Sequence, residues 1–495
     1  MAGNNALRLT SFADEARIAL ATLAERAASV GGANVRLGVT GLSRAGKTVF
    51  ITALVHNLIH GGRLPLLKAY ASGRVSGAHL QPQPDDDVPR FDYETHVADM
   101  VDQRIWPDST RRISELRLTV AFESARFLSR NLGRGKLHID IVDYPGEWLL
   151  DLPLLAKDYA TWSAETLARA AEPHRAEASA AWLAHVREAA ASAPADETLA
   201  RELAGQFTAY LHAVRDDQRS LSIMPPGRFL MPGDLEGSPA LTFSPLYAEG
   251  DVAGRGTLFQ MMARRFEAYK TAVVKPFFRD HFTRLDRQIV LVDILQALNA
   301  GPAALRDLEA TLAEILACFR PGRGSFLGRL LARRIDRILF VATKADHLHH
   351  TDHDRLEAIL RRLVARAVDR AEVSGAGIET VAMAAVRATR EGTIVQNGER
   401  LPSIIGTPME GERLDRQTYD GKTEIALFPG DLPENLDSIF EGGALPPPEP
   451  EDVSEVRFMR FRPPRLERTA EGLTLSLPHI RLDRALEYLV GDRLA

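Results

Sequence analysis

The chain has 495 residues, 45% of them hydrophobic and 26% charged, which is long enough for a core domain with large insertions or for a second domain. The formal net charge of −5 gives no overall attraction to nucleic acid or to an anionic membrane, so we expect no nucleic-acid partner. The single cysteine, Cys318, excludes a disulfide within the chain, and no run of eighteen apolar residues occurs. We therefore expect a cytoplasmic protein without a membrane span.

The first part of the sequence predicts a helix, then a strand, then a second helix. Residues 1–33 have the apolar spacing of an amphipathic helix. Residues 35–39 alternate between apolar and other side chains, as a strand does, and residues 48–60 return to helical spacing. We expect this strand and helix to open the first part of a nucleotide-binding core, which covers residues 34–148.

A phosphate-binding pattern lies between that strand and helix, because Gly41-Leu-Ser-Arg-Ala-Gly46-Lys47-Thr48 fits G-x-x-x-x-G-K-[ST]. Gly41 permits the turn out of the strand, and Gly46 lets backbone N–H groups approach phosphates at the helix N-terminus. Lys47 is placed to bridge the β- and γ-phosphates, and the Thr48 hydroxyl to bind Mg²⁺. A tight turn with a surface lysine is the alternative. The expected nucleotide-binding residues here are Gly41, Ser43, Arg44, Ala45, Gly46, Lys47, Thr48 and Val49.

Two strands and a second metal-binding motif are expected next. Residues 61–107 are rich in Gly, Pro and Asp and have weak periodicity, which predicts a long connection. Strand-like runs at 113–122 and 136–142 flank a glycine-containing turn, which predicts antiparallel pairing. Asp143 then opens Asp143-Tyr-Pro-Gly146, in which the carboxylate binds Mg²⁺ through water and the glycine N–H senses the γ-phosphate.

Thr110 is a further expected Mg²⁺ ligand, because it lies in the loop just before the second strand. Asp143-Tyr-Pro-Gly146 alone is also a good β-turn, and its position after the third strand favours the metal-binding role. The expected metal ligands are therefore Thr48, Thr110 and Asp143.

The remaining sequence alternates between helical and strand-like patterns. Buried apolar strands separated by helices indicate a mostly parallel sheet, so we predict an α/β fold with an antiparallel second strand, a helical insertion and a smaller β-containing insertion. The expected strands are 287–293, 338–343 and 379–385, with helices at 303–319 and 353–371. The expected segments are a helical insertion at 149–285, the second part of the core at 286–390, a β-containing and proline-rich insertion at 391–477, and a core helix at 478–495.

A base-binding motif, Thr343-Lys-Ala-Asp346, follows one of these strands. In the [NT]-K-x-D pattern the aspartate accepts hydrogen bonds from guanine N1 and N2, which adenine does not supply, and the lysine stem packs on the base. The loop at Ala385 and Val386 matches a weaker motif whose backbone N–H groups meet the guanine carbonyl. We therefore expect guanine contacts from Thr343, Lys344, Asp346, Ala385 and Val386.

Several stretches together resemble the YcjX family of bacterial Ras-like P-loop GTP-binding proteins, and the resemblance spans nearly the whole chain. They are GLSRAGKT, WPDSTRR, DYPGEWLLDLPLL, FRPGR, RRIDRILFVATKADHLHH and PHIRLDRALEYLVGD. The resemblance implies a Ras-like GTPase core with insertions, binding of GTP or GDP with Mg²⁺, slow hydrolysis and a role in bacterial stress response. It also implies a protein effector, with a membrane-associated stress protein as one candidate and peripheral inner-membrane location through that partner.

Two positions depart from the common GTPase pattern. Glu147 stands where many GTPases have the glutamine that orients water, and its carboxylate adds negative charge near the γ-phosphate. Arg44 is a cation that compensates this charge, or else it points to solvent or pairs with Glu147 away from the site. Together with Lys47 these are the candidate catalytic residues.

Four histidines, His347, His349, His350 and His353, follow the base-binding motif at spacings that resemble a metal site. We interpret them instead as the solvated start of a helix, since imidazole clusters without fixed surroundings are seldom specific.

Two other functions remain compatible with a phosphate loop. An ATPase or kinase is disfavoured by Thr343-Lys-Ala-Asp346. A nucleotide-binding scaffold with negligible turnover would require Glu147 to prevent hydrolysis. The function that the sequence favours is a GTPase that acts as a conformational switch.

Overall fold

The computed structural model describes residues 33–41, 45–83, 85–108, 112–124, 135–189, 191–216, 224–232, 235–248, 254–318, 335–372, 377–396, 398–414, 417–432, 459–466 and 476–495. The helix expected within residues 1–33 lies outside this part of the chain, and only Ala33, the first residue of a strand, is described there.

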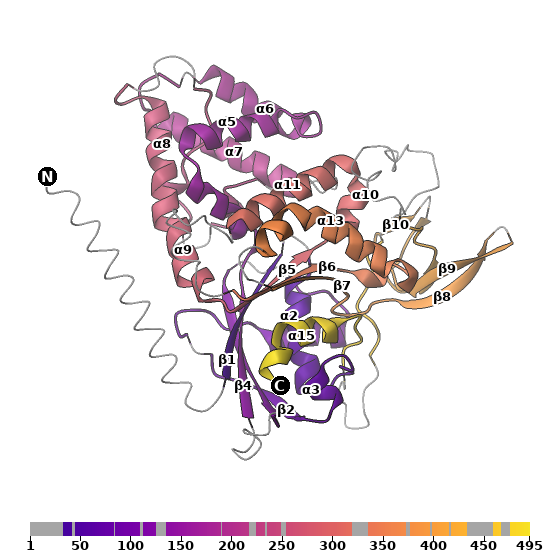
Figure 1. Ribbon diagram of the computed structural model, residues 1–495. Helices are drawn as coiled ribbons and strands as arrows, with labels where there is room; N and C mark the ends of the chain where they lie inside the picture. Colours follow the sequence, from indigo (N-terminus) through magenta and orange to yellow (C-terminus); the bar gives the residue numbers. More distant parts are fainter. Residues whose placement is uncertain are drawn as a thin grey trace.

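A twisted central sheet organises the molecule (Figure 1). In the described ranges it has seven strands in the order β2-β3-β4-β1-β5-β6-β7, with β4, β1, β5, β6 and β7 parallel and with β3 antiparallel to β4. This confirms the predicted mostly parallel sheet with an antiparallel second strand. The bounds are β1 Ala33–Gly41, β2 Val75–Gln81, β3 Ser114–Phe122, β4 Gly135–Asp143, β5 Arg287–Val292, β6 Arg337–Ala342 and β7 Gly377–Ala382.

Helices cover both faces of the sheet, which explains why its central strands are apolar on both sides. In β5, Ile289 and Leu291 pack into one cluster with α2 (Lys47–Ile59) and α15 (Leu482–Val490). The alternate residues of β5 pack into another cluster on the opposite face. The helices on that face are α10 Ile294–Ala300, α11 Pro302–Cys318 and α13 His353–Glu372.

The prediction of one long connection at 61–107 was wrong. The segment contains α3 (Lys68–Ala71), α4 (Tyr93–Ala98) and the edge strand β2. Strand β2 lies at the edge of the sheet, where it pairs antiparallel with β3, and it is half-exposed, so its sequence needs no apolar alternation. Its pairing with β3 is also irregular, because the register shifts between Val75 and Gly77. The periodicity that reveals a buried strand is therefore missing from it.

A group of helices between β4 and β5 lies together at one end of the molecule (Figure 1). The helices are α5 Tyr159–Ala170, α6 Ala176–Glu188, α7 Glu197–Asp216, α8 Leu258–Tyr269 and α9 Lys275–Asp280. Their core is rich in aromatic rings, with Trp162 stacked on Phe266 at 5.0 Å and Trp182 on Tyr210 at 5.0 Å between ring centroids. Most of the described residues of the predicted helical insertion are thus helical, and the exact boundaries of the insertion stay a prediction.

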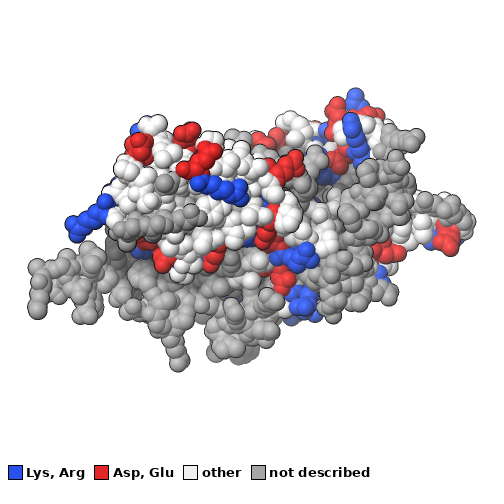
Figure 2. All heavy atoms as spheres, turned by 90° about the horizontal axis from the view of Figure 1, so that it is seen from above, with Lys and Arg blue, Asp and Glu red and all other residues white. Residues whose placement is uncertain are grey.

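The outer surface of this region carries charges of both signs. Seen from above in Figure 2, acidic and basic side chains are interspersed over the part of this face that is drawn in colour. Interspersed charges do not build a single-sign field, which agrees with the small net charge of the chain. In the described parts of the chain, no helix is long and apolar enough to cross a membrane.

A second, smaller sheet follows β7 and projects from the side of the molecule (Figure 1). It consists of β8 Arg390–Gln396, β9 Glu399–Gly406 and β12 Ile425–Leu427, all antiparallel, with the short pair β10 Arg413–Leu414 and β11 Gln417–Thr418 beside it in sequence. Its small core contains Ile404, Met459 and Phe461. This agrees with the predicted β-containing insertion.

Candidate nucleotide-binding site

Both glycines of the phosphate loop are required by the backbone, for different reasons. Gly46 has φ of 84°, a conformation that other residues adopt only at a cost, and a Cβ placed there would meet no atom of the described residues within 4 Å. Gly41 instead packs tightly, since a Cβ there would lie 2.7 Å from the carbonyl oxygen of Leu291 in β5. The loop is therefore closely packed where it leaves the sheet and open where α2 begins.

The first turn of α2 carries the two polar side chains of the motif. Lys47 is buried, and its Nζ donates to the Gly41 carbonyl at 3.5 Å, so the ammonium group lies folded back over the loop. The Thr48 hydroxyl donates to the Asp108 carbonyl at 3.3 Å, which ties α2 to the chain just before residues 109–111. Three predicted site residues, Ser43, Arg44 and Thr110, lie outside the described residues.

Asp143 reaches the same edge of the sheet from the neighbouring strand. It is the last residue of β4, and its partner in the parallel register is Val39 of β1, two residues before Gly41. The side chain is 1% exposed. Carboxyl ends of neighbouring parallel strands meet at one edge, so the fold brings Asp143 to the side of the phosphate loop, where a metal ligand was predicted.

The segment after Asp143 is a 3₁₀ helix, η3 (Gly146–Ala156), and it is buried nearly throughout. Glu147 is buried with it, and its carbonyl oxygen lies so close to Gly227 that a Cβ on that glycine would approach to 1.8 Å. The apolar side chains of η3 belong to the core of the helical region rather than to the core beneath α2. The segment that follows the metal-binding motif is therefore part of the packing of α5 to α9.

Two residues of η3, Trp148 and Asp151, make contacts that fix it against that region. The Arg228 guanidinium lies over the Trp148 ring, 3.2 Å from the ring centroid. The buried Asp151 carboxylate accepts a hydrogen bond from the Gly227 N–H at 2.7 Å and another from the Tyr269 hydroxyl at 2.6 Å. Burial raises the pKa of Asp151 from its ordinary 3.8 to about 6, and the hydrogen bonds from Tyr269 and Gly227 and the charge of Arg228 oppose that rise.

This raised pKa gives a stability prediction. A carboxyl whose pKa is higher in the folded chain stabilises the fold below its unfolded pKa, and that contribution is lost as the pH rises through about 6. Asp151→Asn retains an uncharged hydrogen-bonding group, so we expect the stability of the variant relative to the parent to rise between about pH 4 and pH 7. Urea unfolding of both chains across this range measures the difference, and a difference independent of pH would contradict the prediction.

The base-binding motif lies at the end of β6, at the same edge of the sheet. The Thr343 N–H donates to the Val292 carbonyl at 3.0 Å, and Lys344, at φ of 61°, forms an ion pair with Asp293. Asp346 is 4% exposed, and its Oδ2 accepts a hydrogen bond from the Ala388 N–H at 2.8 Å. The motif is thus held by β5 on one side and by the loop after β7 on the other.

Asp293 is a residue of this site that the sequence reasoning did not include. It follows β5 directly, caps α10 by accepting from the Gln296 N–H at 3.2 Å, and fixes the Lys344 ammonium group. The signal was available, since Asp293 ends a buried strand just as Asp143 does. Two such aspartates at one edge of a parallel sheet predict a common polar site.

The loop that carries Ala385 and Val386 is braced by the C-terminal segment. Ala384 and Ile480 form an antiparallel bridge, and the Arg387 N–H donates to the Pro478 carbonyl at 2.6 Å. Because residues 478–480 are extended for this contact, α15 begins only at Leu482, later than the helix predicted from Pro478. On the other side of the contact, β7 ends at Ala382, before the predicted end at residue 385.

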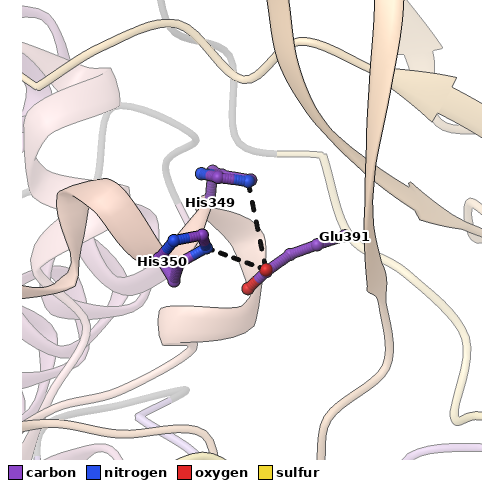
Figure 3. A group of neighbouring side chains, drawn as sticks. All are labelled: His349, His350 and Glu391. Carbon is purple, nitrogen blue, oxygen red and sulfur yellow. Dashed lines mark hydrogen bonds and ion pairs between the residues drawn. The ribbon is translucent and has the colours of Figure 1, made fainter.

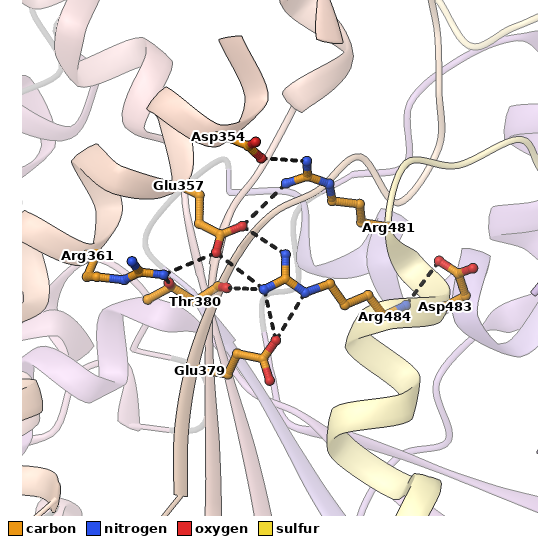
Figure 4. A network of polar contacts seen from close by, with 8 residues as sticks. All are labelled: Asp354, Glu357, Arg361, Glu379, Thr380, Arg481, Asp483 and Arg484. Atoms are coloured by element: carbon orange, nitrogen blue, oxygen red, sulfur yellow. Dashed lines mark hydrogen bonds and ion pairs between the residues drawn. The ribbon is translucent and has the colours of Figure 1, made fainter. Parts of the chain in front are cut away.

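Ion pairs anchor α15 beside this loop (Figure 4). Arg484 contacts Glu357 of α13 at 3.0 Å and Glu379 of β7 at 3.0 Å, and Arg481 contacts Asp354 at 2.8 Å. Glu357 is shared between the two arginines, which gives a network rather than isolated surface pairs. The end of the chain therefore positions the loop in which guanine contacts are predicted.

A family model described as the YcjX-like family, DUF463, matches residues 35–494. The chain belongs to the YcjX-like family. It is 40% identical over 474 residues to the Ras-like GTPase YcjX of Escherichia coli K12, covering 93% of this chain and 96% of that protein. It is 35% identical over 483 residues to the Ras-like GTPase YcjX of Shewanella oneidensis MR-1, covering 93% and 95%. The resemblance inferred from the motifs is confirmed.

In this YcjX-like chain the four histidines after the base-binding motif do not behave as one solvated group. His347 is buried edge-on against the Phe461 ring, 5.5 Å between centroids, and His353 is buried as well. The interpretation of a solvated helix start was wrong for these two. His349 and His350 lie nearer the surface, beside Glu391 of β8.

Replacing Thr48 tests the metal role of the first turn of α2 in this YcjX-like chain. Thr48→Ala should weaken Mg²⁺-dependent GTP binding more than GDP binding, because it removes the oxygen ligand for the ion together with the hydrogen bond to the Asp108 carbonyl. Thr52→Ala is the matched control, as Thr52 lies one turn further along α2 and its hydroxyl donates to the Thr48 carbonyl at 2.8 Å. Nucleotide titrations with and without Mg²⁺ measure the effect. Equal behaviour of both variants would remove Thr48 from the metal site.

Proposed function

We propose that this chain binds GTP and GDP together with Mg²⁺, hydrolyses GTP slowly and acts as a conformational switch. The observation that carries the proposal is the convergence, at one edge of the parallel sheet, of the loop at 41–48, Asp143 and the motif at 343–346. The names of the two relatives, both Ras-like GTPases, support the same activity for this chain.

The residues present fit a magnesium nucleotide. Gly46 leaves open space at the N-terminus of the 13-residue helix α2, whose first N–H groups and dipole favour phosphate. The Thr48 hydroxyl and the Asp143 carboxylate are oxygen ligands of the kind that Mg²⁺ prefers, and Lys47 supplies the point charge for the phosphates. When bound, the ion would neutralise charge on the phosphate oxygens, while these side chains hold the nucleotide in place.

Guanine is the base that the geometry of Asp346 supports best. One carboxylate oxygen is occupied by the Ala388 N–H, which fixes the plane of the group and leaves the other oxygen to accept from a base. Guanine offers donors at N1 and N2 for such an acceptor, and adenine does not. The ion pair with Asp293 likewise holds Lys344 in one orientation, with its stem available to pack on the base. With adenine as the base, the hydrogen bonds to Asp346 would not form, so this geometry disfavours an ATPase.

Hydrolysis depends in this proposal on Glu147 and Arg44. The buried Glu147 places negative charge near the expected γ-phosphate, which disfavours the transition state and accounts for slow turnover. Arg44 would supply the opposing cation. A scaffold without turnover is the alternative if that cation acts elsewhere.

Hydrolysis by Glu147→Gln and by Arg44→Ala distinguishes a slow GTPase from a scaffold without turnover. If Glu147 lies near the attacking water, removing its charge should raise or preserve single-turnover GTP hydrolysis, while Arg44→Ala should lower it at least about a hundredfold. Glu188→Gln, an exposed change on α6, is the matched control. A loss below about threefold in Arg44→Ala, with binding intact, would remove the arginine from the reaction.

The conformational change that follows nucleotide exchange or hydrolysis would be transmitted through η3. This helix follows Gly146, the predicted γ-phosphate sensor, and its side chains are part of the core of α5 to α9. A shift of the Asp143–Gly146 segment would therefore disturb the Trp148–Arg228 and Asp151–Tyr269 contacts. We propose that the helical region presents this change to a protein effector, with a membrane-associated stress protein as one candidate and bacterial stress response as the setting.

Hydrogen exchange of the full chain tests the switch. With GDP and with a non-hydrolysable GTP analogue bound, exchange should differ in η3 and around Tyr269 as well as in the phosphate loop. Lys47→Ala, exposed to the same nucleotides, serves as the control and should show no difference. Identical exchange in the helical region with both nucleotides bound would contradict the proposed output.

A further inference from the structure

Three side chains with metal-binding atoms converge on the surface next to the base-binding motif. His349 and His350 lie between the motif and α13, and Glu391 comes from β8 of the small sheet (Figure 3). The Glu391 carboxylate oxygen Oε2 is 2.8 Å from His350 Nδ1 and 3.9 Å from His349 Nε2. One ligand atom from each residue lies within 4.8 Å of the others.

The surroundings fix the orientation of two of these groups, His349 and Glu391. His349 Nδ1 lies 3.1 Å from the Thr351 hydroxyl, and a hydrogen on that nitrogen leaves the lone pair of Nε2 directed toward Glu391. Arg387 contacts the other carboxylate oxygen, Oε1, at 3.4 Å, which leaves Oε2 on the side of the histidines. Neighbours that hold the second atom of a ligand, as Thr351 does for His349 and Arg387 for Glu391, are typical of metal sites, because they set tautomer and orientation.

We propose that His349, His350 and Glu391 bind a first-row divalent transition-metal ion. Two imidazoles and one carboxylate are a ligand set that Zn²⁺ accepts, with a fourth position left for water. Mg²⁺ is a poor occupant, since it prefers oxygen ligands in octahedral geometry. The site is separate from the Mg²⁺ position proposed at Thr48 and Asp143, and it does not depend on nucleotide binding.

Two of the three separations between ligand atoms are close to those that zinc requires, and the third lies within 4.8 Å. Tetrahedral Zn²⁺ with bonds of about 2.0 to 2.1 Å places its ligand atoms about 3.3 to 3.4 Å apart. The observed 2.8 Å and 3.9 Å lie on either side of this value, so side-chain shifts of about 0.5 Å satisfy both contacts. His349 is 14% exposed and His350 63%, so the ion can enter from solvent.

A bound ion would join two parts of the chain that are distant in sequence. His349 and His350 follow Asp346 by three and four residues, while Glu391 begins the β8–β9 hairpin. The metal would therefore brace the base-binding loop against the small sheet.

Zinc titration of the full chain tests this site. The protein is stripped with a chelator, freed of it, and titrated calorimetrically with zinc chloride in excess Mg²⁺ and without nucleotide. We expect a saturable zinc site that His350→Ala and Glu391→Gln each weaken at least about tenfold, because loss of even an outer neighbour of a ligand costs that much. The midpoint of thermal unfolding should rise with zinc in the parent and not in these variants.

His185→Ala is the matched control, since His185 is an exposed histidine on α6 and should leave the titration unchanged. Glu391→Gln keeps the size and hydrogen-bonding capacity of the side chain, and its unfolding midpoint without metal checks the fold. Zinc binding by Glu391→Gln and His350→Ala as tight as in the parent, or no saturable binding by the parent, would overturn the proposal.

Discussion

Lys47→Ala is expected to abolish tight binding of GTP and to weaken binding of GDP. The Lys47 ammonium group is the buried cation at the first turn of α2, and it is held over the loop by the Gly41 carbonyl. Hydrogen bonds to charged groups contribute about 1.5 to 3 kcal/mol each, so losing the contacts to the β- and γ-phosphates raises the Kd of GTP at least about a hundredfold, and losing the β-phosphate contact raises the Kd of GDP at least about tenfold. Equilibrium titration with a fluorescent GDP analogue measures the change.

A matched lysine elsewhere provides the control for that result. Lys422 is exposed in the loop before β12, and Lys422→Ala should bind nucleotide as the parent does. Circular dichroism shows whether both variants keep the helical content of the parent. If folded Lys47→Ala binds GDP within about threefold of the parent, the assignment of a phosphate loop fails.

Asp346→Asn should reverse the preference for the base. The Ala388 N–H already donates to Oδ2, so an asparagine would direct its amide oxygen to Ala388 and its NH₂ group to the base. That group repels the N1 and N2 donors of guanine and can donate to the C2 carbonyl of xanthine. Each mismatch costs about 1 to 3 kcal/mol, so GTP affinity should fall at least about thirtyfold while XTP affinity rises.

Competition of GTP, XTP and ATP against the same fluorescent analogue measures this reversal, and ATP should compete poorly in both chains. Asp86→Asn, an exposed change in the loop before α4, is the matched control. Should Asp346→Asn retain the GTP affinity of the parent, Thr343–Asp346 is only a turn at a strand end, and the guanine assignment is lost.

The parts of the fold that local sequence determines were predictable. The phosphate-loop motif lies within eight consecutive residues, and Gly46 is needed for a local reason, its φ of 84°, whereas the close packing of Gly41 is against Leu291 of β5. The central strands are buried on both faces, so their apolar runs mark them in the sequence, as in β5. Helix α13 was found within one residue at either end because its periodicity is strong.

The parts that depend on distant contacts were not predictable from one sequence. Strand β2 is stabilised by pairing with β3 rather than by its own pattern. Residues 478–480 are extended because they pair with the loop at Ala384, although their local sequence continues into a helix. Tertiary pairing outweighs local propensity at such positions.

The candidate sites show the same division. The motifs predicted candidate residues for the phosphates and the base. Asp293 could have been included because it follows a buried strand, but its ion pair with Lys344 is visible only in the structure. Glu391 joins His349 and His350 across a separation of 41 residues, which no local spacing reveals. The burial of η3 in the helical core likewise follows from packing of segments far apart in the chain.

Competition binding to the unmodified full chain tests the central claim most directly. GDP, GTP, ADP and ATP are titrated, each with Mg²⁺, against a bound fluorescent GDP analogue. The proposal predicts that GDP and GTP displace the analogue stoichiometrically and that ADP and ATP do so at least about thirtyfold less well, because Asp346 accepts donors that only guanine supplies. Equal displacement by adenine and guanine nucleotides, or displacement by neither, would contradict it.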